Sequence, residues 1–443
     1  MDKESLLKIA QAACEAATAG GAEFADVSAG FGKSLGVDLE SSAIKSCDSR
    51  QGGGISVRAI YKGGTGWSGT DKATIEAAVE AGRNAAKLAK IAEPDPDFIS
   101  LVAPAESYLT VEGLSDPRIA EMEIKQLIEC ALANIDDARA ICSDVTVQGG
   151  FSTWYGSHAL ANSLGVALAS DGSGVSGFIM AIIKRGEDVG SFYDFDYARV
   201  LGDFEPKGVG ASATREAMRF LGARKIETRR MPVVLGPLAS GSIFGSVVGN
   251  ADAEGIQRKR SFMIDKVGVK IGSDALTITD EPHIPRGMSS RGWDSEGFPT
   301  KPMVIMENGV LKSYLYGSYT AGKAGVPNTG HGTRGGGASS SNLIPKLGDM
   351  TSQDIIRATK EGLYINMGGL SPNNTTGDVS ASVDFGFMIE NGELAYPVMN
   401  AMVGGSFLDM LANVDAVSSD YRAEPGAVMP TVRILDCLVA GGK

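Results

Sequence analysis

The chain has 443 residues and a formal net charge of −12 at pH 7, from 41 Lys and Arg against 53 Asp and Glu. Its 43% hydrophobic and 21% charged residues are ordinary for a globular protein and exclude a disordered chain. The acidic balance repels phosphate backbones, so we expect no nucleic-acid partner. Glycine is in excess, with 58 copies in the chain. These scattered glycines predict many short strands joined by tight turns.

The sequence shows no targeting or membrane signal. Residues 1–5 lead directly into an amphipathic pattern, without the basic and apolar segments of a signal peptide. The longest apolar run, residues 178–183, is too short to span a bilayer. The five cysteines form no CxxC pair and are odd in number, which is typical of a reduced chain with buried thiols. We therefore expect a cytoplasmic protein that has no membrane partner.

The first half of the chain mixes helix and strand patterns. Apolar spacing predicts helices over residues 3–18, 72–92, 116–139 and 210–221. Alternating runs predict strands at residues 24–30, 36–45 and 54–61, and further strands over 140–183, broken by a turn at 171–174. The charged stretch 224–230 marks the expected boundary between two domains, residues 1–225 and 226–443.

The second half opens with a predicted strand at 232–235 and a helix of small residues at 237–249. Two Asn-Gly pairs, Asn308-Gly309 and Asn391-Gly392, predict tight hairpins because both residue types tolerate positive φ. Their similar surroundings also allow an internal duplication. The sequence therefore predicts a two-domain α+β fold, with glycine-rich, mostly antiparallel sheets and packed helices.

Four polar residues are the candidates for contact with a substrate or partner. His331 and Arg334 lie in the glycine-rich segment 328–337, where the backbone can approach a ligand closely. Asp294 and Glu296 lie in a short acidic segment upstream. We assign no residue a catalytic role. The glycine-rich segment has few apolar residues, so we expect replacing His331 and Arg334 to weaken binding and to leave the melting temperature nearly unchanged.

An ordered set of short segments resembles the TldD/PmbA family, whose members were once called modulators of DNA gyrase. The segments are Arg258–Phe262, Asp294–Gly297, Asn308–Leu311, Ser318–Ala321, Thr329–His331, Thr376–Asp378, Glu390–Gly392 and Tyr396–Val398. The first half resembles the family more loosely, through its glycine-rich strands and the segment Pro94–Pro96. The resemblance therefore spans nearly the whole chain.

The resemblance implies a branch of this family that does not bind metal. The TldD branch resembles a zinc peptidase with a helical HExxxH motif and a distant cysteine ligand. At these positions the present chain has Phe244 and Gly249 for the histidines, Gly245 for the glutamate and Pro425 near the cysteine. None of these side chains binds zinc. The chain therefore resembles the PmbA (TldE) branch, which implies no cofactor here and zinc in a TldD-type partner.

The resemblance implies the non-zinc, non-catalytic subunit of a heterodimeric metalloprotease that binds and cleaves unfolded or leader-bearing peptides. An extended peptide substrate can add to an exposed sheet edge. A second hypothesis is a peptide-binding or scaffold homodimer that needs no protease partner. A third is an autonomous hydrolase without zinc, using His331 and Arg334 with Asp294 or Glu296. A neighbouring gene for an HExxxH homologue favours the first, and activity that survives chelation favours the third.

Overall fold

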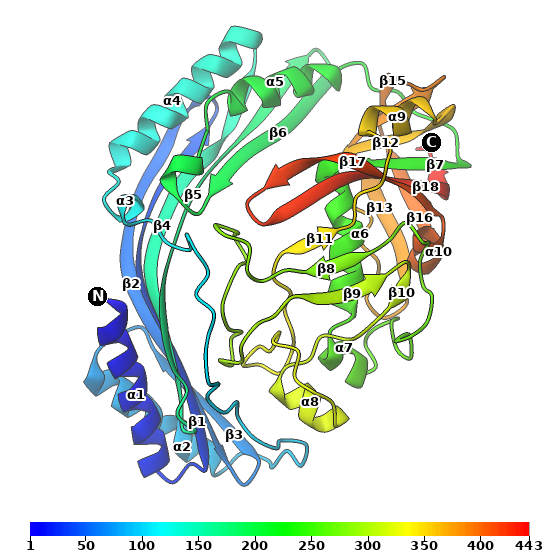
Figure 1. Ribbon diagram of the computed structural model, residues 1–443. Helices are drawn as coiled ribbons and strands as arrows, with labels where there is room; N and C mark the ends of the chain where they lie inside the picture. Colours follow the sequence, from blue (N-terminus) through cyan, green and yellow to red (C-terminus); the bar gives the residue numbers. More distant parts are fainter. Residues whose placement is uncertain (443) are drawn as a thin grey trace.

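A computed structural model describes residues 1–442, and its first half is built on a six-stranded antiparallel sheet (Figure 1). The strand order is β3-β2-β1-β4-β5-β6, so β1 and β4 are central. The bounds are β1 Phe24–Glu40, β2 Ala43–Tyr61, β3 Gly64–Thr70, β4 Thr146–Asn162, β5 Ala167–Arg185 and β6 Asp188–Ala198. Alternate residues of a strand point to opposite faces. One face of this sheet carries helices, and the other, here called the inner face, lies toward the second half of the chain.

The strands are longer than the glycine-rich sequence predicted. β1 and β2 run for 17 and 19 residues, and β5 continues through the expected turn at residues 171–174. The indole of Trp154 explains why position 174 is a glycine within the strand, because a Cβ there would lie 2.3 Å from the indole Nε1. A glycine in a strand can mark such a close approach rather than a turn. The prediction of short strands with a break at 171–174 is therefore wrong.

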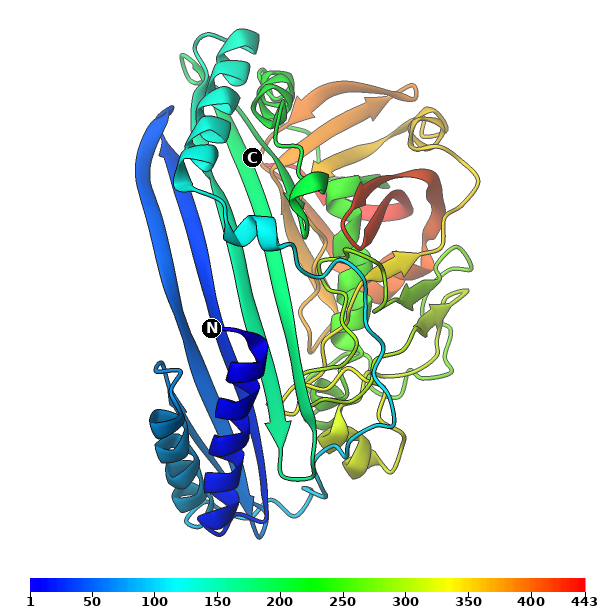
Figure 2. The same ribbon diagram turned by 60° about the vertical axis from the view of Figure 1, so that its left-hand side comes forward.

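Helices cover the outer face of this sheet in two pairs. One pair is α1 (Lys3–Ala19) with α2 (Ile75–Ala89), and the other is α4 (Ile124–Ile141) with α5 (Val209–Arg219). Figure 2 shows α1 and α4 lying over the strands. Small residues bring α1 and α2 close together, since a Cβ at Gly82 would lie 2.2 Å from a carbonyl oxygen of α1.

The single helix expected over residues 116–139 forms as two helices. The first is the short α3 (Pro117–Ala120), and α4 follows it. The side chain of Gln126 accepts a hydrogen bond from the backbone N–H of Glu123 at 2.9 Å, which forms part of a capping box. A capping box satisfies free N–H groups at a helix start, so α4 begins there as a new helix.

The second half contains a larger sheet in the order β13-β16-β18-β7-β12-β14-β15, with β17 beside β18. Its strands are β7 Arg229–Gly236, β12 Glu361–Met367, β13 Asp378–Val383, β14 Phe385–Glu390, β15 Glu393–Val398, β16 Ala401–Ser406, β17 Val414–Glu424 and β18 Ala427–Ala440. Only the β7–β12 pair is parallel among the described strand pairs. A four-stranded sheet adds β8 Ile278–Asp280, β9 Met303–Glu307, β10 Val310–Leu311 and β11 Leu343–Pro345. The α+β class with mostly antiparallel sheets is confirmed.

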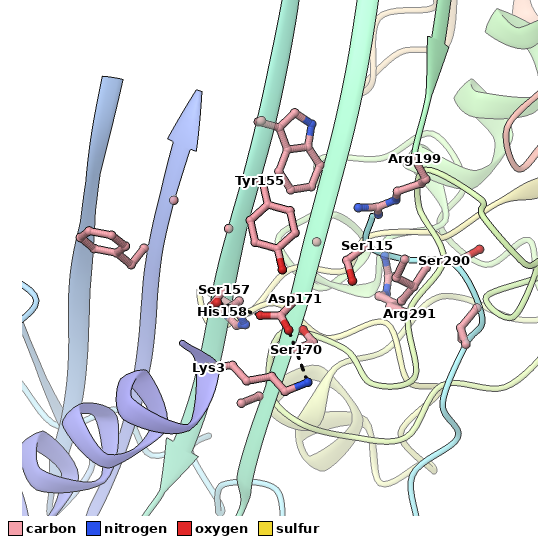
Figure 3. Close-up of a pocket in the computed structure, with 18 of the residues that line it drawn as sticks. Lys3, Ser115, Tyr155, Ser157, His158, Ser170, Asp171, Arg199, Ser290 and Arg291 are labelled. Atoms are coloured by element: carbon pink, nitrogen blue, oxygen red, sulfur yellow. Dashed lines mark hydrogen bonds and ion pairs between the residues drawn. The ribbon is translucent and has the colours of Figure 1, made fainter. Parts of the chain in front are cut away.

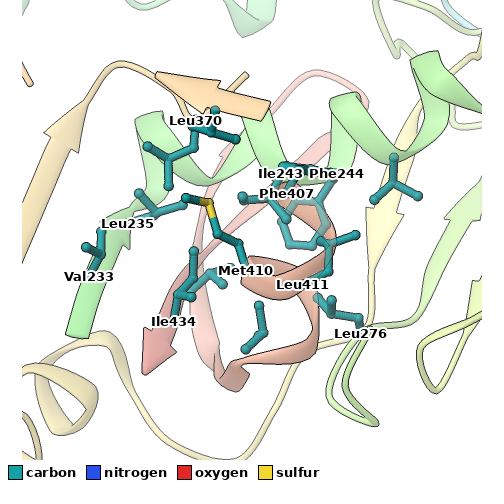
Figure 4. Close-up of a cluster of buried hydrophobic side chains, with 14 of the residues drawn as sticks. Val233, Leu235, Ile243, Phe244, Leu276, Leu370, Phe407, Met410, Leu411 and Ile434 are labelled. Atoms are coloured by element: carbon teal, nitrogen blue, oxygen red, sulfur yellow. The ribbon is translucent and has the colours of Figure 1, made fainter. Parts of the chain in front are cut away.

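One helix forms the centre of the second half's core. Helix α6 (Pro237–Asn250) packs the side chains of Ile243 and Phe244 against α10 (Phe407–Ala412), as Figure 4 shows. The remaining short helices are α7 Ala253–Gln257, α8 Ser318–Ala324, α9 Ser352–Arg357 and the 3-10 turn η1 Leu201–Asp203. The predicted helix at 237–249 is confirmed, and it is held by a buried apolar side.

Both predicted hairpins are present. Asn308 and Gly309 join β9 to β10 with φ of 48° and 76°, and Asn391 and Gly392 join β14 to β15 with φ of 52° and 80°. Positive φ at both turn positions is the conformation that favours Asn-Gly. The two hairpins lie in different sheets.

The described part of the chain, residues 1–442, contains no helix long and apolar enough to cross a membrane. All five cysteines are free, and Cys14, Cys142 and Cys437 are buried. The six-stranded sheet ends before residue 225 and the larger sheet begins after it. The division into domains at residues 225 and 226 stays a prediction.

Candidate functional site

The four residues singled out by the sequence lie in loops packed near the inner face of the first sheet. His331 and Asp294 are each 2% exposed and Glu296 is 6% exposed. The side chain of Arg334 is 10% exposed. Their segments therefore form a buried polar layer in place of a solvent-facing binding loop.

His331 is fixed on both sides of its ring. Its Nε2 lies 3.2 Å from Asp280 Oδ2, and its Nδ1 lies 3.0 Å from Thr329 Oγ1. Asp280 also accepts a hydrogen bond from the backbone N–H of Ser341 at 2.6 Å. Both ring nitrogens are engaged within the chain, so His331 holds loops together.

Asp294 joins two loops through backbone N–H groups. Its Oδ1 accepts hydrogen bonds from Glu296 N at 3.0 Å and Phe298 N at 2.9 Å, and its Oδ2 accepts one from Gly332 N at 2.7 Å. Burial raises the pKa of this carboxyl group. Asp294 therefore ties its own turn to the glycine-rich segment 328–337.

Glu296 is a buried carboxyl group at the start of α8. It accepts hydrogen bonds from the backbone N–H of Ser318 at 2.7 Å and from its hydroxyl at 2.6 Å. Burial raises the pKa of Glu296 to about 7. A Cβ at position 332 would lie 2.1 Å from the Glu296 carboxylate, which explains the glycine there. The site therefore holds a carboxyl group that titrates near neutral pH.

Arg334 connects the second half to the first sheet. Its Nε donates to Asp26 Oδ1 at 2.8 Å, and its Nη2 donates to the carbonyl oxygens of Asp26 and Ser56 at 3.0 Å each. Arg58 also pairs with Asp26 and donates to the carbonyl oxygen of Arg334 at 2.8 Å. Both guanidinium groups lie over the ring of Trp67, at 5.2 Å and 5.6 Å from its centroid. Asp26, Arg58 and Arg334 are called the arginine bridge below.

We expected the replacement of His331 and Arg334 to leave the melting temperature nearly unchanged. The burial and hydrogen bonds of both side chains argue against this expectation. Loop glycines serve packing within the chain. A Cβ at Gly330, where φ is +78°, would lie 2.8 Å from the carbonyl oxygen of Pro299. The sequence pattern of glycines around a histidine did not distinguish a loop packed against its own chain from one that approaches a ligand.

Sequence reasoning missed a cavity of about 900 Å³ next to this layer. Its lining residues come from both faces of the first sheet, from the segment 109–115 and from the segment 290–295. On the inner side it is lined by Trp154, Arg199 and Arg291, and Figure 3 draws Arg199 and Arg291 on the same side of the strands.

Four glycines in one row form the floor of this cavity. Gly52, Gly32, Gly156 and Gly172 are register partners across β2, β1, β4 and β5. All four line the cavity. A row without side chains lets another backbone approach the sheet face. The row cannot be found from the sequence, because the four glycines become neighbours only when the strands pair.

The four positions that the resemblance relates to the zinc site of the TldD branch have no donor side chains. Phe244 is 3% exposed and packed in the apolar core (Figure 4). Gly245 and Gly249 lie on the open side of α6, and Pro425 lies at the turn between β17 and β18. Among residues 1–442 no group of three or more His, Cys, Asp or Glu is arranged to hold a metal ion. The donor set at these positions does not fit zinc.

The arginine bridge predicts a large stability loss for Arg334→Ala. The change removes three hydrogen bonds and leaves two buried carbonyl oxygens without this donor. We expect the free energy of unfolding to fall by about 3 kcal/mol, measured by urea denaturation. The matched control is Arg83→Ala on the exposed side of α2, which we expect to change it by less than about 0.5 kcal/mol. Equal stability of the two variants would show that Arg334 is not structural.

Glu296 predicts a specific pH dependence of stability. Because its folded-state pKa of about 7 exceeds the usual 4.5, its contribution is complete below about pH 4 and is lost as the pH rises through 7. Between pH 4 and pH 8, wild type should lose up to about 3 kcal/mol relative to Glu296→Gln. Urea denaturation across this range measures the difference, with Glu80→Gln on the exposed side of α2 as control. Parallel pH profiles of wild type and Glu296→Gln would contradict the assignment.

Three domain models of one protein family match most of this chain. Residues 228–441, 117–221 and 25–89 match the C-terminal domain, the central domain and domain 1 of the PmbA/TldA metallopeptidases. Metalloprotease PmbA of Escherichia coli is 29% identical over 67% of this chain and 65% of that protein. A PmbA homologue of Haemophilus influenzae is 29% identical over 95% of this chain and 92% of that protein.

A solved structure shares the whole fold. TldE from Thermococcus kodakarensis superimposes with a TM-score of 0.88 at 22% identity, covering 98% of this chain and 100% of that one. Domain 1 and the central domain match the two segments that together form the six-stranded sheet, and the C-terminal domain matches the segment with the other two sheets. The chain therefore belongs to the PmbA/TldD family.

Proposed function

We propose that this chain is the non-zinc subunit of a two-subunit protease of the TldD/TldE type. The observation that supports this most is the chemistry of α6 and the β17–β18 turn, where Phe244, Gly245, Gly249 and Pro425 replace metal-binding and proton-transferring side chains. The relatives are named metalloproteases, so the zinc that such a protease needs belongs to a TldD-type partner with the HExxxH motif.

In this proposal the chain contributes binding of an extended peptide. The cavity over the glycine row offers sheet surface that is open at Gly52 and covered by the Trp154 indole at Gly172, beside charged walls. Glycine positions let a peptide backbone lie close against the face of the sheet, where van der Waals contact depends little on the peptide's sequence. This suits unfolded or leader-bearing peptides as substrates.

The two other hypotheses receive less support from the geometry. An autonomous hydrolase based on His331 needs a free ring nitrogen, and both nitrogens are held by Asp280 and Thr329. Asp294 accepts three backbone hydrogen bonds and Glu296 is held by Ser318. A homodimer without a protease partner shares the same cavity and differs only in the partner, which a reconstitution experiment decides.

The test combines the purified chain with the TldD-type homologue from the same organism. We expect neither protein alone to cleave an unfolded protein such as reduced and alkylated casein. The mixture should cleave it, lose the activity with a chelator, and elute as a complex in gel filtration. The control is a mixture in which the glutamate of the partner's HExxxH motif is replaced by glutamine, which should be inactive.

Two results would contradict the proposal. Cleavage by this chain alone, resistant to chelation, would favour the autonomous hydrolase. Absence of a complex, together with full activity of the TldD-type protein by itself, would favour a homodimer without a protease partner.

A further inference from the structure

The inner side of the cavity carries excess positive charge in a protein whose net charge is −12. Arg50, Arg199 and Arg291 line it, and Asp294 is the acidic residue among the lining residues of this side. The Asp294 carboxylate is 2% exposed, and both of its oxygens accept backbone hydrogen bonds. Asp294 offsets part of the charge of Arg291, and the three arginines leave this side with a net positive charge.

Arg291 has donors left over. Its Nη2 donates to the carbonyl oxygen of Ser339 at 2.7 Å and its Nη1 to that of Ser340 at 3.1 Å. Its Nε is buried and has no hydrogen-bond partner in residues 1–442. A guanidinium group has five N–H donors. The two bonds engage one N–H on each Nη and Nε is enclosed, so the second N–H of Nη1 and of Nη2 are the donors left for a ligand. Among residues 1–442 no carboxylate forms an ion pair with Arg291 within 4.0 Å, although the charges of Asp280 and Asp294 act on it and raise its pKa against the larger lowering by burial.

Arg199 lies on the other side of the same space. It donates to carbonyl oxygens, most closely to that of Met288 at 2.6 Å, and its guanidinium group lies 5.5 Å from the centroid of the Trp154 ring. Among residues 1–442 no carboxylate forms an ion pair with Arg199, and burial alone shifts its pKa. Burial lowers the pKa of both guanidinium groups. An unpaired, partly desolvated guanidinium group gains from a bound anion.

The glycine row lies directly beside these arginines. At Gly32 and Gly156 a Cβ would lie 2.8 Å and 2.9 Å from carbonyl oxygens of the paired strand, so these positions stay bare. At Gly52 a Cβ would meet nothing within 4 Å, so this end of the row is open. The row supplies a flat floor for a peptide backbone, and Trp154 supplies an apolar wall.

We propose that this part of the cavity is a binding site for a carboxylate group on an extended peptide, held by Arg199 and Arg291 while the peptide backbone lies on the glycine row. Guanidinium and carboxylate match in a planar, two-point geometry, which a smaller or spherical anion does not use. The inference rests on the proposed peptide-binding function and names the chemical class of peptide that the subunit prefers. The carboxylate comes from the peptide's C-terminus or from an acidic side chain.

Calorimetric titration of the full chain, without a protease partner, tests this site. Three octapeptides with acetylated N-termini serve as probes. Two share one sequence without charged side chains, and of these one has a free C-terminal carboxylate and the other an amidated C-terminus. The third is amidated and has a glutamate at a central position. We expect a carboxylate-bearing peptide to bind at least tenfold more tightly than the amidated peptide without an acid. The stronger of the two carboxylate peptides identifies the source of the group.

Variants separate recognition from folding. Arg291→Gln should weaken binding of the preferred peptide at least tenfold, and Arg291→Lys should recover part of the loss. Arg83→Gln removes the same charge from the exposed side of α2 and should leave binding unchanged. Gly52→Leu fills the open end of the floor without touching either arginine, and should also block binding while the melting temperature stays close to that of wild type.

The outcomes distinguish this inference from the proposed function. Carboxylate-dependent binding with no activity in the reconstituted mixture would keep the site and reject the protease subunit. Protease activity of the mixture with equal binding of all three peptides, with no binding of any, or with Arg291→Gln equal to wild type, would overturn the carboxylate site.

Discussion

A buried ion cluster fixes the glycine-rich loop of the second half to the first sheet, beside other contacts between the halves such as the ion pair of Arg422 with Asp194 and the packing of Phe220 on Phe387. Asp26 on β1 accepts from Arg58 on the neighbouring strand and from Arg334, which lies 308 residues away in the second half. Two guanidinium groups share one carboxylate, and the ring of Trp67 stacks near both. Truncating one member of a buried cluster leaves other polar groups unsatisfied, so the bridge has one stable arrangement. That arrangement holds the glycine-rich loop against the inner face of the first sheet.

The cavity is a consequence of this docking. Asp294 binds Gly332 of the docked loop, and its own segment provides one wall of the cavity. The opposite wall is the sheet itself, where four paired glycines contribute no side chains of their own and the Trp154 indole lies over Gly172. The chain thus presents a glycine-floored cavity walled by arginines and by the Trp154 indole. Such an arrangement suits binding and positioning of a peptide.

The sequence was sufficient for those features that depend on local chemistry. The amphipathic helix α1, the small-residue helix α6 and the two Asn-Gly hairpins depend on nearby residues in the sequence, and each was predicted. Short ordered motifs were also enough to place the chain in its family. What failed was the interpretation of glycine. At Gly174 and Gly332 the absent Cβ makes room for Trp154 and Glu296, contacts that exist only after strands pair and loops dock.

The candidate site shows the same limit. Its four residues were identified by sequence, and they do lie near one another, but their burial depends on partners such as Asp26 and Asp280, far away along the chain. Arg199, Arg291 and the glycine row were missed because no local pattern marks them. These residues share only their position around the cavity. Strand register and the arginine bridge bring them there.

The claim that this chain supplies binding and a partner supplies zinc is tested most directly by metal content. Elemental analysis of the gently purified chain, and of its complex with the TldD-type homologue, gives the number of zinc ions per polypeptide. The account predicts no stoichiometric metal in this chain and one zinc ion per pair in the complex. One tightly held transition-metal ion per chain in the protein purified alone would contradict it.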